Sequence, residues 1–181
     1  MKECTETDKP EIEKSQTDGP LVSIVLATYN PRMEWLREQL TSLENQTYRP
    51  LELMVMDDCS TKIALGEIRD CVEACIQSIP YRIMQNEENL GSNKTFEKLT
   101  LLARGEYIAY CDQDDVWHEE KIKCLLDLFT KDNINLAYSD VWLIDESGEI
   151  TADSITELRK RHLLCRGPNL AEKLLIQNFV I

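Results

Sequence analysis

Four short apolar runs are spaced along the chain, and they predict its framework. They are LVSIVLA (21–27), LELMVM (51–56), YRIMQ (81–85) and EYIAYC (106–111). Runs of this length suit strands better than helices. The first is rich in β-branched residues, which fits a strand that is buried on both faces. The pattern therefore predicts four strands with buried side chains.

Apolar residues at helical spacing follow each run and predict four helices. The sets are Leu36, Leu40 and Leu43; Ile68, Val72, Cys75, Ile76 and Ile79; Phe96, Leu99, Leu102 and Ala103; and Ile122, Leu125, Leu126 and Phe129. Pro31 fits a helix start, whereas Pro80 and Gly105 fit helix ends. A strand–helix order repeated four times requires crossovers between parallel strands. We therefore expect an α/β domain over residues 21–181, with a mostly parallel sheet and helices on both faces.

The remaining segments lie outside this repeat. Residues 1–20 are charged, poor in apolar side chains and closed by Gly19-Pro20, which predicts a disordered polar leader. LAYSDVWLID-ESGEI (136–150) predicts a hairpin with Gly148 in its turn. RKRHLLCR (159–166) is a basic patch that fits a solvated helix face, a diphosphate contact or a lipid headgroup contact. NLAEKLLIQNFVI (169–181) is amphipathic.

Charge and cysteine content narrow the class of protein. The 33 acidic residues against 20 basic ones give a net charge of −13, so the surface repels nucleic acid phosphates and anionic lipid. No apolar run approaches the roughly 20 residues of a membrane helix. The seven cysteines are scattered without a CxxC pair, which favours reduced thiols in a cytoplasmic protein.

Polar side chains follow every predicted strand, and this places a candidate site. In an open parallel sheet, ligands bind beyond the carboxyl ends of the strands. Asp112 and Asp114 follow the fourth strand within the sequence DQDD. Their crowded carboxylates can hold a divalent cation, and oxygen ligands favour Mg²⁺ or Mn²⁺ over Zn²⁺. A solvated loop in which Asp115 caps the next helix fits the same residues.

The other three loops offer groups that suit a nucleotide. Asp57 and Asp58 can accept hydrogen bonds from a base or a ribose, or they can form a turn. Tyr29 can stack on a base and Asn30 can orient it, although TYNP also fits a plain strand-to-helix turn. Asn89-Leu90-Gly91 precedes a helix and can hold its backbone close to a ligand, or can form a plain turn. Lys94 on that helix can reach a phosphate or a base carbonyl, or can remain solvated.

Two long segments together resemble a known family. They are LVSIVLATYNPRMEWLREQLTSLENQTYRPLELMVMDDCST and NEENLGSNKTFEKLTLLARGEYIAYCDQDDVWHEEKI. Over roughly residues 21–145 the chain is similar to family 2 glycosyltransferases of the GT-A fold. The sequence DQDDVW after GEYIAYC is particularly similar to bacterial rhamnosyltransferase-like members, which build O-antigen and capsule.

The resemblance implies a role for each matching position. Thr28, Tyr29 and Asn30 would line the nucleotide base, and Asp58, with Asp57 beside it, would hold that base. The remaining roles concern the diphosphate end. Asp112 and Asp114 match the DxD pair: the first faces the ribose or the sugar, and the second binds the Mg²⁺ or Mn²⁺ that bridges the diphosphate. Lys94 is a looser match to a basic position that contacts the base.

The resemblance also implies the reaction and its partners. A UDP- or dTDP-sugar would lose its sugar, with inversion, to a saccharide or lipid-linked acceptor during synthesis of bacterial surface polysaccharide. The enzyme would work in the cytoplasm, peripheral at the inner membrane in its full-length form. A carboxylate would act as general base, and we assign it to no residue. Because the acceptor half of the family follows this region, we expect the chain to be incomplete at its C-terminus, and a donor-binding module without turnover is the alternative.

Two other enzyme classes fit single motifs only. A phosphatase of the haloacid dehalogenase type would place a pair like Asp112 and Asp114 on its first strand, and a response-regulator receiver would do the same with Asp57 and Asp58. Here, the preceding strands contradict both. A dinucleotide oxidoreductase would need GxGxxG, which the chain lacks.

Overall fold

The computed structural model describes residues 7–8, 19–131, 134–146 and 148–154. The chain divides into two compact units, Met1–Cys124 and Leu125–Ile181, and we describe each by itself. The first unit contains a five-stranded sheet, and the second contains a two-stranded hairpin.

The sheet of the first unit is mostly parallel. Its strands are β1 (Thr7–Asp8), β2 (Val22–Thr28), β3 (Leu51–Asp57), β4 (Tyr81–Gln85) and β5 (Tyr107–Cys111). They lie in the order β1-β4-β3-β2-β5, and only β1 runs antiparallel to its neighbour. All four strands predicted from the apolar runs are present, which confirms the α/β fold.

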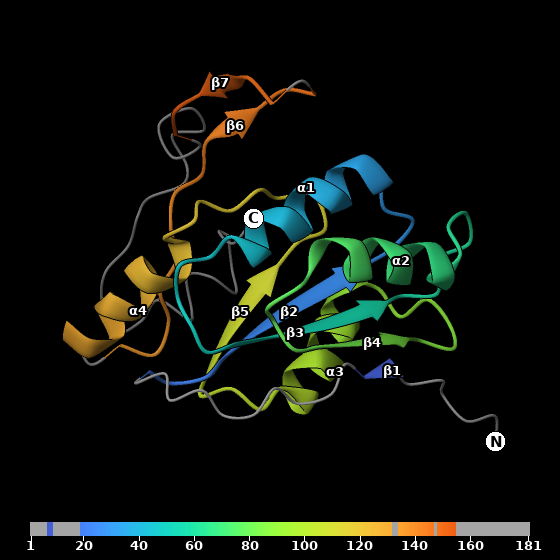
Figure 1. Cartoon of the computed structure of the whole chain (residues 1–181), viewed down its shortest axis with the longest axis horizontal. Coiled ribbons are helices and arrows are strands. Elements are labelled where there is room, and N and C mark those ends of the chain that lie inside the picture. The colour runs from blue at the N-terminus through green and yellow to red at the C-terminus, as the bar shows by residue number, and fades with distance from the viewer. Residues whose placement is uncertain (1–6, 9–18, 132–133, 147, 155–181) are drawn as a thin grey trace. The chain divides into compact units, whose positions relative to one another are not determined.

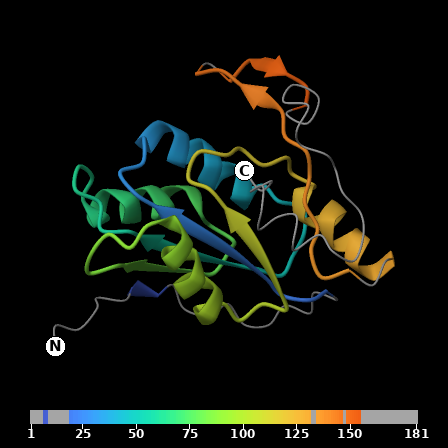
Figure 2. The ribbon, with the colours of Figure 1, turned by 180° about the vertical axis from the view of Figure 1, so that it is seen from behind.

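Three helices cover the two faces of this sheet. Figures 1 and 2 show α1 (Met33–Glu44) and α2 (Leu65–Cys75) on one face and α3 (Ser92–Leu102) on the other. α4 (Lys121–Lys131) follows β5 and crosses the boundary between the two units. The crossovers between parallel strands therefore leave helices on both faces, as predicted.

The core follows from the alternation of side chains along the strands. All seven residues of β3 are buried. Met54 and Met56 belong to a cluster on the α3 face that also contains Val25, Met84 and Leu99. Since successive strand residues point to opposite faces, the residues between them point toward α1 and α2. A strand buried on both faces favours apolar residues at consecutive positions, and Leu53–Met56 in the middle of β3 are all apolar; the buried Glu52 and Asp57 lie near its two ends and are hydrogen-bonded.

One helix is shorter than its apolar spacing predicts. α2 ends at Cys75, whereas Ile76 and Ile79 were assigned to the helix by their spacing. Ile76 has extended backbone, and both isoleucines are fully buried from the loop that precedes β4. Apolar spacing reports burial, and a loop that packs on the core produces the same pattern as a helix.

The predicted polar leader contains an ordered pair of residues. Thr7 and Asp8 form β1 and pair with Ile83 and Arg82 at the edge of the sheet. Residues 1–6 and 9–18 lie outside the described part of the chain, so the prediction of disorder stays a prediction there.

The second unit contains the predicted hairpin. β6 (Leu143–Ile144) pairs antiparallel with β7 (Ile150–Ala152). Gly148 has a φ of +83° in the turn, a conformation that favours glycine. The basic patch at 159–166 and the amphipathic segment at 169–181 lie outside the described residues. None of the helices within the described ranges is long and apolar enough to span a bilayer.

A buried carboxylate ties the amino-terminal edge of the sheet to the loop before β5. Glu52 is 4% exposed, and its carboxylate accepts hydrogen bonds from the Arg104 N–H (2.8 Å), the Arg104 Nε (3.0 Å) and the Ser23 hydroxyl. The Gly105 N–H donates to the same hydroxyl (2.7 Å), and a Cβ on Gly105 would lie only 2.6 Å from the Ser23 nitrogen. Burial raises the pKa of Glu52, but these hydrogen bonds outweigh it and leave the pKa below its ordinary value.

We expect Glu52→Gln to destabilise the fold in a pH-dependent way. A lowered folded-state pKa contributes stability above the unfolded pKa of about 4.3, and this contribution is lost as the pH falls through the lower folded value. Urea unfolding at pH 7 should show a loss of about 2 kcal/mol, reduced because Arg104 is half exposed. The difference should shrink toward pH 3. The exposed Glu38→Gln is the matched control, and an equal loss at both pH values would contradict this role for the ionised carboxylate.

Candidate functional site

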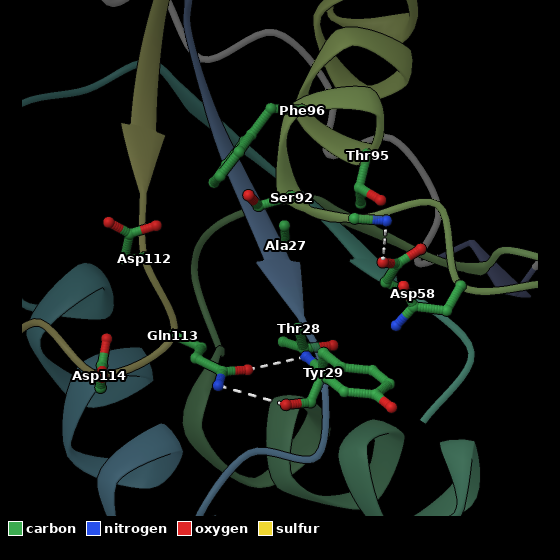
Figure 3. Close-up of a pocket in the computed structure, with 12 residues that line it drawn as sticks. Ala27, Thr28, Tyr29, Asp58, Ser92, Thr95, Phe96, Asp112, Gln113 and Asp114 are labelled. Atoms are coloured by element: carbon green, nitrogen blue, oxygen red, sulfur yellow. Dashed lines mark hydrogen bonds between the residues drawn. The ribbon is translucent and has the colours of Figure 1, made fainter. Parts of the chain in front are cut away.

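The carboxyl ends of β2, β3 and β5 meet at one edge of the sheet. The register pairs Thr28 of β2 with Asp57 of β3 and Leu26 of β2 with Cys111 of β5. The loops that follow these strands, together with the start of α3, enclose a pocket of about 420 Å³ (Figure 3). The pocket is lined by Ala27, Thr28, Tyr29, Asp58, Asn89, Gly91, Ser92, Thr95, Phe96, Asp112, Gln113 and Asp114.

Five of the eight predicted site residues line this pocket. They are Thr28, Tyr29, Asp58, Asp112 and Asp114. Figure 3 shows Asp58 on one side and Asp112 and Asp114 on the other, with Tyr29 between the loops that carry them. Asn30, Asp57 and Lys94 are not among the lining residues.

Asn30 holds a neighbouring loop instead of lining the pocket. Its φ is +45°, a conformation that asparagine adopts more readily than most residues. Its side-chain oxygen accepts hydrogen bonds from the Thr61 N–H (2.9 Å) and the Lys62 N–H (2.7 Å). Its own backbone N–H donates to the Ser60 hydroxyl (2.7 Å). In this structure Asn30 therefore links the loop after β2 to the loop after β3.

Asp57 is fully buried, and its carboxylate bonds within the protein. It accepts hydrogen bonds from the Gln85 Nε2 (2.9 Å), the Ser60 N–H (2.9 Å) and the Thr28 hydroxyl (3.3 Å). These contacts join the ends of three adjacent strands. The turn interpretation of the Asp57-Asp58 pair thus fits the first of the two aspartates.

Asp58 both lines the pocket and shapes it. One carboxylate oxygen accepts from the Leu90 N–H (2.9 Å) and the Asn86 Nδ2 (2.8 Å), and the other accepts from the Gly91 N–H (2.8 Å). Gly91 has a φ of +80°, which a residue with a side chain rarely adopts. Burial raises the pKa of Asp58, but the hydrogen bonds from Leu90, Asn86 and Gly91 more than offset this, so its pKa lies below the ordinary value. Asp58 is therefore ionised near neutral pH.

In the acidic loop after β5, the carboxyl pKa values are shifted upward, opposite to the shift of Asp58. Partial burial raises the pKa of Asp112, and the neighbouring Asp114 raises it further. The pKa of Asp115 is raised by burial and then by Asp112. Lys121 opposes both shifts, while its own pKa is lowered by burial. These carboxylates favour a positive charge among them, and Lys121 supplies only part of it.

The pocket offers only part of a metal site. Among the residues that the structure describes, no group of three His, Cys, Asp or Glu side chains is arranged to hold a metal ion. Asp112 and Asp114 supply carboxylate oxygens, which are the ligands that Mg²⁺ and Mn²⁺ prefer. Mg²⁺ usually completes its coordination with water and substrate phosphates. Two carboxylates at the pocket wall fit that arrangement.

Several pocket residues were not predicted from the sequence as site residues. Phe96 was assigned to the apolar face of its helix, and it packs edge-to-face on Tyr110 with ring centroids 5.6 Å apart. α3 begins directly after the Asn89–Gly91 loop, so Ser92, Thr95 and Phe96 share the face toward the pocket. The helical spacing of these three residues, in the first turns after the polar loop, could have identified them from the sequence as pocket residues. Lys94 is exposed and is not among the lining residues.

These features define an α/β protein with a ligand pocket at the carboxyl edge of a parallel sheet, and sequence comparison identifies the family. The pattern of "Glycosyl transferase family 2" matches residues 23–174. The chain therefore belongs to glycosyl transferase family 2.

Individual relatives agree with this assignment. An uncharacterised glycosyltransferase of Methanocaldococcus jannaschii is 34% identical over 137 residues, covering 75% of this chain and 46% of the relative. A dTDP-rhamnosyl transferase of Shigella flexneri is 32% identical over 126 residues, covering 68% of this chain and 43% of the relative. The chain thus spans less than half of the length of both proteins.

A solved structure has the same fold. The S. aureus TarS 1-349 structure in complex with UDP-GlcNAc superposes with a TM-score of 0.54 at 27% identity. The match covers 61% of this chain and 31% of TarS 1-349. The predicted GT-A fold is confirmed.

We expect Asp58→Asn to release the Asn89–Gly91 loop. An amide cannot accept hydrogen bonds at its nitrogen, so either the Leu90 or the Gly91 N–H would face another donor. Hydrogen–deuterium exchange at Leu90 and Gly91 should accelerate, and unfolding should become easier by about 1–3 kcal/mol. Asp70→Asn, an exposed change on α2, is the control. Unchanged protection of both amides would show that Asp58 does not hold this loop.

Proposed function

We propose that the pocket binds the nucleoside diphosphate of a UDP- or dTDP-sugar, and that the protein transfers the sugar to an acceptor hydroxyl. The observation that carries this proposal is the convergence of Tyr29, Asp58, Asp112 and Asp114 from three separate strand ends on one pocket. Membership of glycosyl transferase family 2 supplies the reaction class. A nucleotide sugar needs an aromatic surface for its base and a positive charge beside its diphosphate. One side of the pocket offers Tyr29 for the base, and the other offers Asp112 and Asp114 to hold a cation for the diphosphate.

The base belongs at the Tyr29 and Asp58 side of the pocket. Tyr29 is 43% exposed, so its ring is accessible for stacking on a base. Asp58 is ionised and can accept a hydrogen bond from a base N–H. Thr28 and the Asn89–Gly91 loop complete this side. The same carboxylate that holds the loop would thereby read the base.

The diphosphate belongs at the acidic side, together with a divalent cation. Asp114 and Asp112 would hold Mg²⁺ or Mn²⁺, and Asp112 would also face the ribose. When bound, the cation acts as a Lewis acid that stabilises the charge developing on the departing diphosphate. Three aspartates line the pocket, and no lysine or arginine is among its described lining residues, which supports a cation as the partner of the diphosphate.

The wider setting is proposed from the relatives. Sugar transfer with inversion to a saccharide or lipid-linked acceptor, in synthesis of bacterial surface polysaccharide, follows from the family resemblance; the Shigella relative supports a dTDP-rhamnose donor. The TarS complex with UDP-GlcNAc supports a uridine nucleotide, whereas the rhamnosyl transferase supports thymidine. We place the protein in the cytoplasm, with peripheral attachment to the inner membrane in its full-length form.

The alternative for this chain is a donor-binding module without turnover. Asp58, Asp112 and Asp114 are the three carboxylates that line the pocket, and all three are assigned to the donor and its cation. No carboxylate among the described lining residues remains to deprotonate an acceptor, a step that typically contributes about 10²–10⁴-fold in rate. Sugar transfer to an acceptor by the 181-residue chain itself would rule this alternative out.

We expect Asp114→Ala to abolish the contribution of Mn²⁺ to nucleotide binding. Calorimetric titrations of UDP and dTDP, each with and without Mn²⁺, should show tighter binding of one nucleotide with the cation. The variant should lose at least about tenfold in affinity with Mn²⁺, which corresponds to about 1.4 kcal/mol, and little without it. Glu106→Ala, which removes an exposed carboxylate at the opposite edge of the sheet, is the control. Binding that is indifferent to Mn²⁺ and to the loss of Asp114 would refute the proposal.

A further inference from the structure

The middle residue of the DxD pair bonds to the end of β2, which lies between the two sides of the pocket. The Gln113 Oε1 accepts a hydrogen bond from the Tyr29 N–H (2.8 Å), and its Nε2 donates to the Tyr29 carbonyl (3.3 Å). Figure 3 shows both bonds, which cross from the acidic loop to the end of β2. One side chain thus holds both polar groups of a single residue that is 84 positions away in the chain.

This contact extends the hydrogen bonding between β2 and the β5 segment beyond the last paired residues of the two strands. The ladder between β2 and β5 ends with the pair Leu26 and Cys111, and the chain turns at Gln113. A primary amide carries the same donor and acceptor as a peptide group. Gln113 therefore takes the place that the backbone of a longer β5 would have beside Tyr29. The backbone of Asp112–Asp114 is thereby free to turn while its position relative to β2 stays fixed.

A second amide holds the same loop from the opposite side. Gln39 on α1 is fully buried, and its Nε2 donates to the Asp112 carbonyl and to the Cys111 Sγ (2.8 Å). The loop is consequently held at Asp112 by α1 and at Gln113 by the end of β2. Two contacts on adjacent residues fix where the two flanking aspartates lie.

We propose that Gln113 is a positioning residue, which sets the spacing between Tyr29 and the Asp112–Asp114 pair for a ligand that reaches both. This inference rests on the proposed function, because only a nucleotide with a diphosphate extends from the base side to the acidic side. A ligand that contacts two preorganised groups does not have to order them on binding. Without Gln113, the diphosphate end and the base end would no longer be at a fixed separation.

The test compares ligands that reach one side with a ligand that reaches both. In Gln113→Met, which keeps the size of the side chain and removes the amide, UDP with Mn²⁺ should bind about tenfold more weakly. Uridine, which has no diphosphate, should bind as it does to the wild type, and so should Mn²⁺ alone. Should dTDP be the preferred nucleotide, dTDP and thymidine replace them. Gln113→Asn keeps the amide but is one methylene shorter, so it should lose affinity in the same selective way.

A measurement without ligand tests the contact itself. Hydrogen exchange of the Tyr29 amide should accelerate about tenfold in Gln113→Met, since that amide loses its acceptor. The Asp58 amide, which donates to the Thr28 carbonyl (2.7 Å), should keep its rate and serve as the local reference. Gln77→Met, the same change on an exposed glutamine before β4, should alter neither amide nor the affinity for UDP.

The outcomes separate this inference from the proposed function. Equal losses for uridine and UDP would overturn it, because Gln113 would then act on the base end directly. If the wild type binds UDP and Gln113→Met binds it equally well, the inference would also be overturned, but the proposed function would stand. A wild type that binds neither nucleotide would defeat the proposed function. In that case an unchanged Tyr29 exchange rate would overturn the positioning contact as well.

Discussion

The parallel pairing of β2 with a neighbour on each side is the constraint on which the site depends. β3 and β5 are separated by about 50 residues in the chain, yet both run alongside β2 in a fixed register. Parallel strands end at the same edge, so the loops after all three must meet there. Every polar contact in the pocket, including those of Asp58 and Gln113, refines an arrangement that this ladder has already made. A slip of β3 by one residue would exchange its two faces and carry Glu52 and Asp57 away from Ser23 and Thr28, their partners on β2.

Two adjacent aspartates at the end of β3 show how the same residue type serves structure and site. Asp57 is the last residue of the ladder, and its carboxylate is surrounded by Gln85, Ser60 and Thr28. Asp58 is one residue further, so it points to the other face and reaches the Asn89–Gly91 loop. The first carboxylate locks strand ends together, whereas the second builds a pocket wall. Both keep hydrogen-bond donors around a buried carboxyl group, which would otherwise be costly to bury.

The strands and the edge that bears the site could be predicted from the sequence because they follow from short-range patterns. Apolar runs report strands, and polar residues after them report the ligand edge. The same patterns could not show that Asn30 and Lys94, which also follow predicted strands, lie outside the pocket lining. A backbone conformation turns Asn30 toward residues 61–62, and the position of the first turn of α3 brings Thr95 and Phe96 to the pocket in preference to Lys94. The contact between Gln113 and Tyr29 joins positions that no local pattern relates.

The carboxylates on the two sides of the pocket differ in how their negative charge is compensated. Asp58 carries a full charge that backbone N–H groups stabilise, whereas Asp112 and Asp115 repel each other and have raised pKa values. Lys121 lies near the acidic loop but is itself partly desolvated, so it relieves this repulsion incompletely. A diphosphate brought to such a surface alone would add further negative charge, whereas a divalent cation would reverse the balance. Because ionic attraction falls off with distance, the proposed complex would require the carboxylates to stay close to the diphosphate while the base stays on Tyr29. In the proposed complex, the hydrogen bonds that fix the loop, together with its acidic residues, would set the length of ligand that the pocket accepts.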